Sequence, residues 1–300
     1  MNHRPPSIHA RQPEDPERTA LIHLLKDRGI SPQRRLGQVF LFRQSVADQI
    51  VGLARTAGGD VVVEIGPGLG ILTRPLARTG ARIVGLEFDS RLAAYLQGAI
   101  NDPQVEIIRA DALNYDYPGL QQRSGSRLII VGNLPYYMTS PLIFTLIRLR
   151  SFVSRMVLMI QREVAERVSA PPDGDGYGVI SIFSQMFFDV GRRLTVVKDC
   201  FYPMPAVDSE VVVFTTRARP LAEVGDERLF ASLVQVSFAR PRKTLLNALK
   251  ACNYFDRGRD RILEALRDCG IDPMRRARTL SIDEYAGLAN AIFPGNALRR

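Results

Sequence analysis

The sequence predicts an α/β protein in which a mostly parallel, open sheet is followed by a small all-helical domain. Apolar runs of strand length alternate with helix-compatible segments through the first two thirds of the chain. The expected strands cover 61–65, 81–87, 105–109, 128–132, 156–160, 194–197 and 211–215. After residue 217 the apolar spacing is helical, over 229–238, 244–249, 262–266 and 281–289. We therefore expect a disordered leader over 1–20, an α/β domain over 21–216 and a helical domain over 217–300.

Composition and charge are those of a globular protein with a polyanionic partner. The 300 residues are 46% hydrophobic and 24% charged, and the net charge is +9. The segment 217–300 holds 16 Lys/Arg and 10 Asp/Glu, so +6 of that charge lies in the helical part. Such a surplus indicates a nucleic acid as the partner, although it can also serve solubility alone. No apolar run is long enough for a membrane span and no signal-peptide core is present, so we expect a cytoplasmic protein without membrane contact.

Cysteine and histidine are placed in a way that disfavours metal sites and catalytic triads. The three cysteines, Cys200, Cys252 and Cys269, are far apart in sequence and form no paired motif. All three histidines fall within the first 23 residues. We therefore expect reduced thiols, no metal site and no Ser-His chemistry.

A glycine loop follows the first strand and is the first ligand-binding signal. Gly66-Pro67-Gly68-Leu69-Gly70 ends the strand, and Glu87 lies 21 positions after Gly66 at the end of the next strand. This spacing is that of a Rossmann-type nucleotide site, in which the acidic residue binds ribose hydroxyls. The third glycine comes one place earlier than in a dinucleotide motif, and Glu64 would repel a pyrophosphate. S-adenosylmethionine, with its ammonium and sulfonium groups, therefore fits better than NAD; the alternative is a plain tight turn.

A second signal is the stiff loop Asn133-Leu134-Pro135-Tyr136, which follows the strand at 128–132. The Asn133 amide oxygen and the nearby backbone carbonyls form a cluster of acceptors, because Pro135 has no N–H to bond one of them. With the Tyr136 ring beside it, this cluster suits an exocyclic amine on a flat ring, most simply adenine. The alternative is an ordinary turn with a half-buried tyrosine.

A third strand-end residue, Asp111, could accept the amino group of a bound adenine. It follows the strand at 105–109. The alternative is a helix N-cap.

Taken together, the motifs resemble the KsgA-type small-subunit ribosomal RNA adenine dimethyltransferases from about Gly29 to Ala289. The matching stretches are RRLGQVFL (34–41), EIGPGLG (64–70), LEFD (86–89), ADAL (110–113), NLPY (133–136), FYPMPAVDS (201–209) and SFARPRKTLLNAL (237–249). The resemblance implies a Rossmann-like, S-adenosylmethionine-dependent methyltransferase fold of about seven strands with a small helical C-terminal domain. It implies a monomer that dimethylates the N6 amines of two adjacent adenosines near the 3′ end of the 16S rRNA of the small ribosomal subunit, in small-subunit biogenesis.

The resemblance also implies roles for individual residues of the cofactor site. Gly66 and Gly68 would line the methionine part of S-adenosylmethionine, Glu87 would bind its ribose and Asp111 its adenine. Val39 and Leu41 would close over the cofactor, and Asn133 would border it. The family usually has Asn or His at the position of Val39, so any contact there would come from backbone or apolar surface.

For the target adenine, the resemblance implies that Asn133, Leu134, Pro135 and Tyr136 hold one side while Phe201 stacks on the other. The expected rRNA contacts are basic residues of the C-terminal domain, where Pro241 replaces one of the family's paired arginines. They are Arg240, Arg242, Lys243, Arg275, Arg276 and Arg278. A solvated helix face is the alternative for each of these side chains.

Two other functions stay open from the sequence. One is a large-subunit rRNA methyltransferase of the resistance type, which shares the N-terminal motifs but not the stretch at 237–249. The other is a non-enzymatic ribosome-assembly factor, against which the intact Asn133, Tyr136, Gly66 and Glu87 argue.

Overall fold

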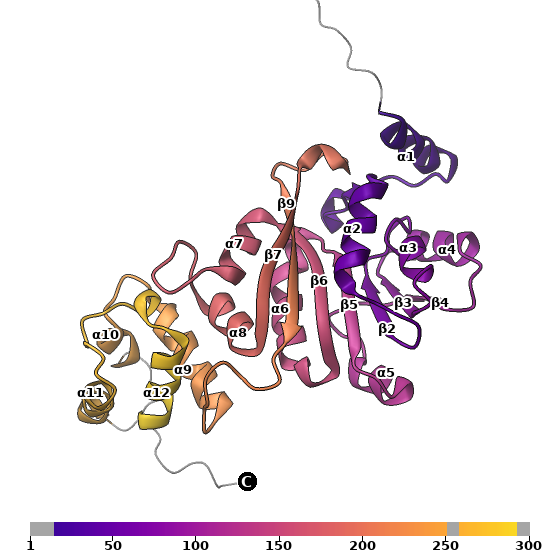
Figure 1. The fold of residues 1–300 in the computed structure, drawn as a ribbon. Coiled ribbons are helices and arrows are strands. Elements are labelled where there is room, and N and C mark those ends of the chain that lie inside the picture. Colours follow the sequence, from indigo (N-terminus) through magenta and orange to yellow (C-terminus); the bar gives the residue numbers. More distant parts are fainter. Residues whose placement is uncertain (1–14, 251–257, 293–300) are drawn as a thin grey trace, which may run out of the picture.

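The computed structural model describes residues 15–250 and 258–292 (Figure 1). Its centre is a seven-stranded sheet in the order β4-β3-β2-β5-β6-β9-β7. The strands are β2 (Val61–Ile65), β3 (Arg82–Glu87), β4 (Val105–Arg109), β5 (Leu128–Asn133), β6 (Val153–Gln161), β7 (Phe188–Val196) and β9 (Ser209–Thr216). The predicted open α/β sheet is confirmed, although β7 begins six residues before the expected strand at 194–197.

The direction of the strands divides the sheet into a parallel part and an antiparallel edge. Strands β4, β3, β2, β5 and β6 are parallel, and β9 runs antiparallel to both β6 and β7. From β2 the chain moves outward through β3 to β4, and then returns to place β5 on the other side of β2. This reversal is the point at which open α/β sheets bind ligands, outside the carboxyl ends of the strands. Ile65 pairs with Gly132 there, so the loops after β2 and β5 leave the sheet side by side.

Helices cover both faces of the sheet because the central strands are apolar on both sides. In β2, Val61, Val63 and Ile65 pack into one core cluster, while Val62 packs into another. The first cluster includes residues of α5 (Tyr117–Ser124), α6 (Thr139–Arg148) and α8 (Val179–Phe187), and the second those of α2 (Gln44–Ala54) and α3 (Thr73–Ala77). This part also contains α4 (Ser90–Ala99) and α7 (Arg162–Ser169).

The helix α5 was not predicted from the sequence. Its polar residues give it little amphipathic pattern, but Asp116 caps its start by accepting from the Gly119 N–H at 2.9 Å. Gly125 ends it in a left-handed conformation.

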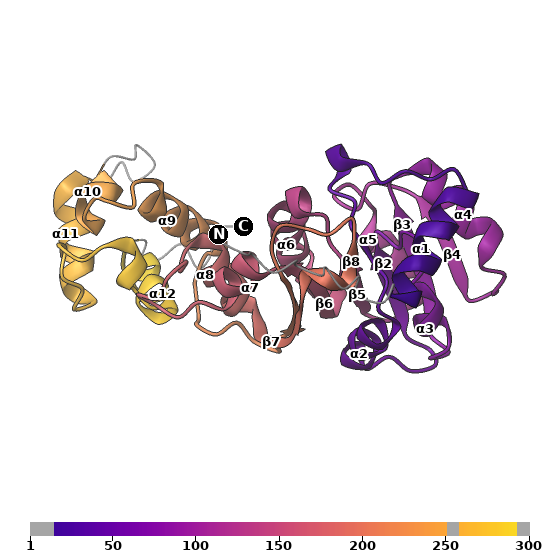
Figure 2. The same ribbon diagram turned by 90° about the horizontal axis from the view of Figure 1, so that it is seen from above.

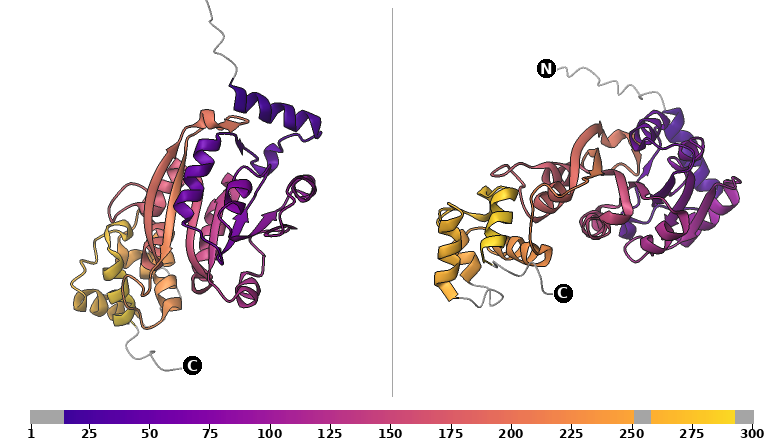
Figure 3. Two further views of the ribbon diagram at one scale, coloured as in Figure 1. Left: turned by 45° about the vertical axis from the view of Figure 1, so that its right-hand side comes forward. Right: turned by 60° about the horizontal axis from the view of Figure 1, so that its bottom comes forward.

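The N-terminal region differs from the predicted leader. Helix α1 (Pro16–Asp27) begins within the expected disordered segment, because the Asp15 carboxylate accepts from the N–H groups of Glu17 and Arg18. The rest of that leader, residues 1–14, lies outside the described residues. Figure 3 shows α1 on the outside of the sheet-bearing part, at the end opposite the C-terminal helices.

After α1, a segment that we call the N-terminal arm (residues 33–41) crosses the carboxyl end of the sheet. It contains the short helix η1 (Arg34–Leu36) and the strand β1 (Phe40–Leu41). Strand β1 pairs antiparallel with β8 (Phe201–Tyr202), which forms a second, two-stranded sheet that the sequence did not predict.

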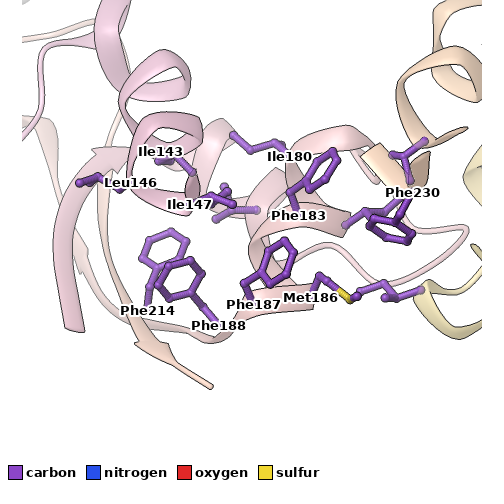
Figure 4. Packing of buried hydrophobic residues seen from close by; sticks show 14 of the residues in the cluster. Ile143, Leu146, Ile147, Ile180, Phe183, Met186, Phe187, Phe188, Phe214 and Phe230 are labelled. Atoms are coloured by element: carbon purple, nitrogen blue, oxygen red, sulfur yellow. The ribbon is translucent and has the colours of Figure 1, made fainter. Parts of the chain in front are cut away.

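In the described residues, the C-terminal region contains four α-helices, as the apolar spacing predicted. They are α9 (Glu227–Ala239), α10 (Leu245–Lys250), α11 (Gly258–Asp268) and α12 (Ile282–Ile292). Figure 2 shows them at one end of the molecule, beyond α8. Phe230 of α9 packs edge-to-face on Phe183 of α8 with ring centroids 5.9 Å apart, and both belong to the large core cluster (Figure 4). The helical region therefore shares a continuous core with the sheet. In the described ranges, no helix is long and apolar enough to cross a bilayer.

The close approach of β5 to β2 gives a stability prediction. A Cβ at Gly132 would lie 2.9 Å from the Ile65 carbonyl oxygen and 3.2 Å from its Cβ, so Gly132→Ala must move backbone. We expect a loss of about 1–3 kcal/mol in unfolding free energy, measured by urea denaturation. The matched control is Gly98→Ala in α4, where a Cβ meets nothing within 4 Å and alanine is expected to stabilise by about 0.5–1 kcal/mol. Equal effects at both positions would contradict the packing argument.

Candidate functional site

A cavity of about 220 Å³ opens at the carboxyl ends of β2, β3, β4 and β5, where the chain reversal places it. This volume is far more than a few water molecules need. Its walls come from the N-terminal arm and from four strand-end loops. They are residues 36–41, 64–69, 86–89, 110–113 and 133–135, with Ile71, Leu72, Leu92, Tyr137 and Met138.

The glycine loop after β2 forms one wall with its backbone. Gly66 and Gly68 have φ values of 65° and 60°, in the left-handed region that side chains rarely adopt. A Cβ at Gly68 would also lie 3.4 Å from the Phe40 ring, which packs over the loop. Glycine therefore lets the arm and the loop come close together, with backbone exposed to the cavity.

Glu87, at the end of β3, is a buried and ordered acceptor. Its two carboxylate oxygens accept from the Gly68 N–H at 3.0 Å and the Asp89 N–H at 2.9 Å. Burial raises the pKa of Glu87, while these backbone donors act in the opposite direction. The carboxylate faces the cavity with lone pairs to spare, as a ribose-binding residue would.

Glu64 is a buried acid in the wall of the cavity. Its side chain is 1% exposed, and its Oε2 atom has no hydrogen-bond partner among the described residues. Burial raises the pKa of Glu64 to about 8, the neighbouring Thr73 side chain opposes this shift, and the charge of Glu87 adds to it. An unpartnered buried acid that lines a cavity indicates a ligand with a cationic or donor group.

Asp111 also lines the cavity, in the turn after β4. Its Oδ1 accepts from the Leu113 N–H at 2.9 Å and its Oδ2 from the Asn114 amide at 2.7 Å. The alternative of a helix N-cap is wrong, because the next helix is α5 and Asp116 caps it.

The loop after β5 presents two acceptors at the cavity. The Nδ2 atom of Asn133 donates to the Val39 carbonyl of the arm at 3.1 Å, which leaves Oδ1 without a donor among the described residues. The Leu134 N–H bonds to Met159, while the Leu134 carbonyl accepts no hydrogen bond in the described part of the chain. The Pro135 carbonyl is used within the loop by the Met138 N–H. Two oxygens therefore remain available to a ligand that carries a pair of N–H groups.

Most of the residues selected from the sequence line this one cavity. They are Val39, Leu41, Gly66, Gly68, Glu87, Asp111, Asn133, Leu134 and Pro135. Tyr136 does not line it: the ring is half-buried, the hydroxyl is buried without a partner among the described residues, and burial raises the pKa of the phenol. The neighbouring Tyr137, which was not selected, lines the cavity and is 57% exposed.

Phe201 does not lie where its expected role would place it. The side chain is 2% exposed and lies outside the cavity lining, so its stacking on a ligand ring stays a prediction that this conformation does not support. Strand β8 pairs Phe201 with Leu41, and both side chains pack in the core cluster on the α2 side of the sheet. Phe201 instead packs with Leu41 in this core cluster and so helps to hold the N-terminal arm in place.

Sequence reasoning also missed Gln38, Phe88 and Asp89. All three line the cavity, and Phe88 is 58% exposed beside Glu87. Gln38 lies in the stretch 34–41, which was selected for Val39 and Leu41, and Phe88 and Asp89 lie in the stretch 86–89, which was selected for Glu87. Their place next to a selected residue was the signal in the sequence that could have found them.

The basic residues of the C-terminal region divide into exposed and paired ones. Arg240, Arg242 and Lys243 lie exposed after α9, and Arg276 and Arg278 are exposed before α12. Arg278 also forms an ion pair with Asp173 at 3.3 Å. Arg275 is engaged with Glu284 through two hydrogen bonds of 2.5 and 3.1 Å, which raises its pKa. Its assignment as a polyanion contact stays a prediction, which this ion pair within the domain does not support.

Comparison with known proteins gives one consistent family. The model of the ribosomal RNA adenine dimethylase family matches residues 30–293. The chain is 40% identical over 271 residues to the ribosomal RNA small subunit methyltransferase A of Geobacter metallireducens, covering 90% of this chain and 98% of that protein. It is 39% identical over 282 residues to the protein of the same name from Shouchella clausii, covering 93% and 95%.

Solved structures share the fold at lower identity. A dimethyladenosine transferase from Plasmodium falciparum has a TM-score of 0.69 at 24% identity, covering 82% of this chain and 94% of that one. The 23S rRNA methyltransferase ErmE has a TM-score of 0.65 at 23% identity, covering 84% and 99%.

The buried Glu64 gives a pH-dependent stability prediction. Because its pKa rises from 4.5 in the unfolded chain to about 8 in the folded protein, the folded state holds a proton that the unfolded chain releases. Glu64 therefore lowers stability progressively as pH rises from 4.5 to 8. In the ligand-free protein, Glu64→Gln is expected to stabilise by up to about 5 kcal/mol at pH 8 and by little at pH 4.5, measured by chemical denaturation.

The control for this prediction is Glu163→Gln, at an exposed position of α7. It is expected to change stability by less than about 0.5 kcal/mol at either pH. A Glu64→Gln gain of the same size at both pH values would show that charge burial is not its cause.

Proposed function

The chain belongs to the ribosomal RNA adenine dimethylase family, and from this premise we propose that it transfers methyl groups from S-adenosylmethionine to the N6 amines of two adjacent adenosines near the 3′ end of small-subunit rRNA. It is thus an rRNA adenine methyltransferase by family. The observation that supports the proposal most directly is the pair of free acceptors at the end of β5. The Asn133 Oδ1 and the Leu134 carbonyl border a cavity that the cofactor would occupy.

The residues of the cavity fit S-adenosylmethionine. The orphaned Glu64 carboxylate would pair with the cofactor ammonium, and the backbone of Gly66 and Gly68 would lie along its methionine part. Glu87 would accept from the ribose hydroxyls and Asp111 from the adenine amine. Val39 and Leu41 of the arm would close the remaining side. When bound, S-adenosylmethionine supplies a methyl group activated by a sulfonium.

The two acceptor oxygens would make the adenine N6 amine, a poor nucleophile, reactive by holding it in a fixed orientation. The lone pair of an adenine N6 amine is delocalised into the ring, so the amine must be held with its lone pair free. The Asn133 Oδ1 and the Leu134 carbonyl would each accept a hydrogen bond from one amine N–H, and this fixes the direction of the lone pair. The N-methylammonium group that forms loses its extra proton readily to water, so no strong base is needed. The stiff Pro135 would keep both acceptors in place, because its ring fixes φ.

Tyr136 is our proposed stacking residue for the target adenine, although it lies outside the cavity lining. It follows the two acceptors directly, and its half-buried ring is held in the turn η2 (Tyr136–Met138). Phe201 is not proposed for the opposite face, because it is packed in the core.

We propose that exposed basic residues of the C-terminal region contact rRNA phosphates. Arg240, Arg242 and Lys243 fill the stretch after α9, and Arg276 adds a fourth charge. Phosphate contacts position an RNA without reading its sequence, so the site would be selected by rRNA shape and by an unstacked adenine.

Two alternatives are weaker. A large-subunit substrate rests on the fold likeness to ErmE at 23% identity, whereas the curated relatives at about 40% identity over most of the chain carry the small-subunit name. A purely non-enzymatic assembly role is disfavoured by the retained Asn133, Glu87 and glycine loop. A cytoplasmic location, action as a monomer and a role in small-subunit biogenesis stay predictions.

The proposal is tested by methyl transfer from labelled S-adenosylmethionine to unmethylated small ribosomal subunits, with large subunits in parallel and nucleoside analysis of the products. Dimethyladenosine in the small subunit alone is expected. Label in the large-subunit RNA would show that the substrate is the large-subunit rRNA. Tight binding to subunits without label in either subunit would favour the non-enzymatic role as an assembly factor.

Asn133→Ala is expected to lower the rate of methyl transfer by at least about 100-fold, because one of the two acceptors is lost. Binding of S-adenosylhomocysteine, measured by calorimetry, should weaken by no more than about threefold, since Asn133 only borders the cofactor space. Asn101→Ala, at an exposed position before β4, serves as the control and should change neither quantity. Equal losses of transfer and cofactor binding would contradict the role of Asn133.

Replacing both Arg242 and Lys243 with alanine is expected to weaken binding to small subunits and to flatten its dependence on salt. The slope of log K against log salt should fall by about 1–2, one unit for each lost phosphate contact. The control with the same charge loss is Arg78→Ala with Arg82→Ala, which lie between α3 and the amino-terminal end of β3, whereas the cavity lies at the carboxyl end of that strand. An unchanged slope in the first variant would place the RNA face elsewhere.

A further inference from the structure

A chain of hydrogen bonds runs from the cofactor side of the cavity to the Asn133 amide through the N-terminal arm. It begins at Asp89, which directly follows Phe88 and is 6% exposed. Asp89 Oδ2 accepts from the side-chain amides of Gln38 at 3.0 Å and Gln33 at 3.2 Å. Arg91 donates to the same carboxylate at 2.7 and 3.1 Å. Two glutamines of the arm thus converge on one buried acid.

Asp89 is a strong anchor because it stays charged. The Arg91 guanidinium holds the pKa of Asp89 well below its usual range, and the Gln38 amide contributes in the same direction. Hydrogen bonds to an ionised acceptor are shorter and stronger than neutral ones. Asp89 also caps α4 by accepting from the Arg91 N–H at 3.0 Å, so its own position is fixed by a helix.

Gln38 is held at both ends of its side-chain amide. The Nε2 atom donates to Asp89, and the Oε1 atom accepts from the Gln33 N–H at 2.8 Å. The backbone of the arm is therefore fixed at Gln38. The next carbonyl along the chain, that of Val39, accepts from Asn133 Nδ2 at 3.1 Å.

The Val39 carbonyl decides which end of the Asn133 amide faces the cavity. An amide has a donor end and an acceptor end, and only the donor end can meet a carbonyl oxygen favourably. A flipped amide would set two oxygens against each other and would present N–H groups to the target amine. The acceptor role of Asn133 thus depends on the placement of the Val39 carbonyl.

We propose that Gln38, anchored by Asp89, is a positioning residue that orients the Asn133 amide so that Oδ1 is the atom offered to the target adenine. Its effect on rate rests on the proposed function, whereas its effect on the amide exists in the free protein. Asp89 donates its own N–H to Glu87, the expected ribose ligand, at 2.9 Å. The same anchor therefore connects the cofactor side of the cavity with the acceptor for the substrate.

The test uses two glutamines that bond the same carboxylate oxygen. Gln38→Met keeps the length and approximate volume of the side chain but removes its hydrogen bonds, and Gln33→Met is the matched control. Gln33 lies farther from Val39, and its backbone N–H, the one that bonds Gln38, survives the change. Unfolding temperatures of both variants check that each is folded, and Gln38→Ala provides a second variant at the same position.

Two readouts are measured on each variant. The first is the side-chain amide resonance pair of Asn133 in ¹⁵N-labelled free protein, assigned by its loss in Asn133→Ala. The second is the single-turnover rate of methyl transfer at saturating S-adenosylmethionine, with S-adenosylhomocysteine affinity alongside. We expect Gln38→Met to shift the Asn133 resonances, to speed their hydrogen exchange and to lower the rate roughly 10- to 100-fold, with affinity changed by less than about threefold. Gln33→Met should resemble the unmodified protein in its resonances, hydrogen exchange, rate and affinity.

Each contrary result is informative. Unchanged Asn133 resonances in Gln38→Met would overturn the proposal whether or not the protein methylates RNA. Shifted resonances with an unchanged rate at saturation would overturn the catalytic consequence, and equal losses in both variants would overturn the specific path through Gln38. If the unmodified protein transfers no methyl group, the proposed function fails, while the resonances still decide the orientation of the amide.

Discussion

The pairing of β5 with β2 is the constraint on which the site depends. Both strands are parallel, and they lie next to each other only because the chain returns to the middle of the sheet after β4. Their carboxyl ends therefore release two loops at one point, the glycine loop at Gly66 and the acceptor loop at Asn133. The close approach at Gly132 leaves no room for a side chain between them. Both loops line one cavity because these two backbones are in contact.

The cavity contains two buried acids that favour ligand binding at the expense of the stability of the ligand-free protein. Glu64 and Glu87 are both buried, and burial is the main cause that raises the pKa of each. Glu87 is compensated by two backbone N–H donors, whereas one oxygen of Glu64 has no partner in the described residues. An acid in that state destabilises the folded protein and becomes favourable only when a cationic group arrives. Strain of this kind is expected where function, not folding, has selected the residue.

The helical C-terminal region is continuous with the sheet domain in its packing. Rings of α8 and α9 meet edge-to-face, and Tyr177 donates its hydroxyl hydrogen to the Leu280 carbonyl at 3.0 Å. The loop before α8 adds an ion pair between Asp173 and Arg278. The exposed basic residues after α9 are therefore attached to a helical region that shares its core with the sheet.

Much of the fold and of the cofactor side followed from the sequence by itself. Strand runs that are apolar on both faces, glycines that interrupt them and an acid at the proper spacing are local signals. The sheet, the loop at Gly66 and the positions of Glu87 and Asp111 at the cavity could therefore be predicted. The acceptor loop at Asn133 was found in the same way, because proline and asparagine act on their own backbone.

What only the tertiary structure decided depends on contacts between distant segments. Phe201 is buried because β8 pairs with β1, and Arg275 forms an ion pair with Glu284 within the domain. Tyr137 lines the cavity, although its neighbour Tyr136 was the tyrosine selected from the sequence as part of the motif NLPY (133–136). The orientation of the Asn133 amide is set by Val39, 94 positions away. No local pattern encodes these four outcomes, since each is fixed by a partner that only the folded chain brings near.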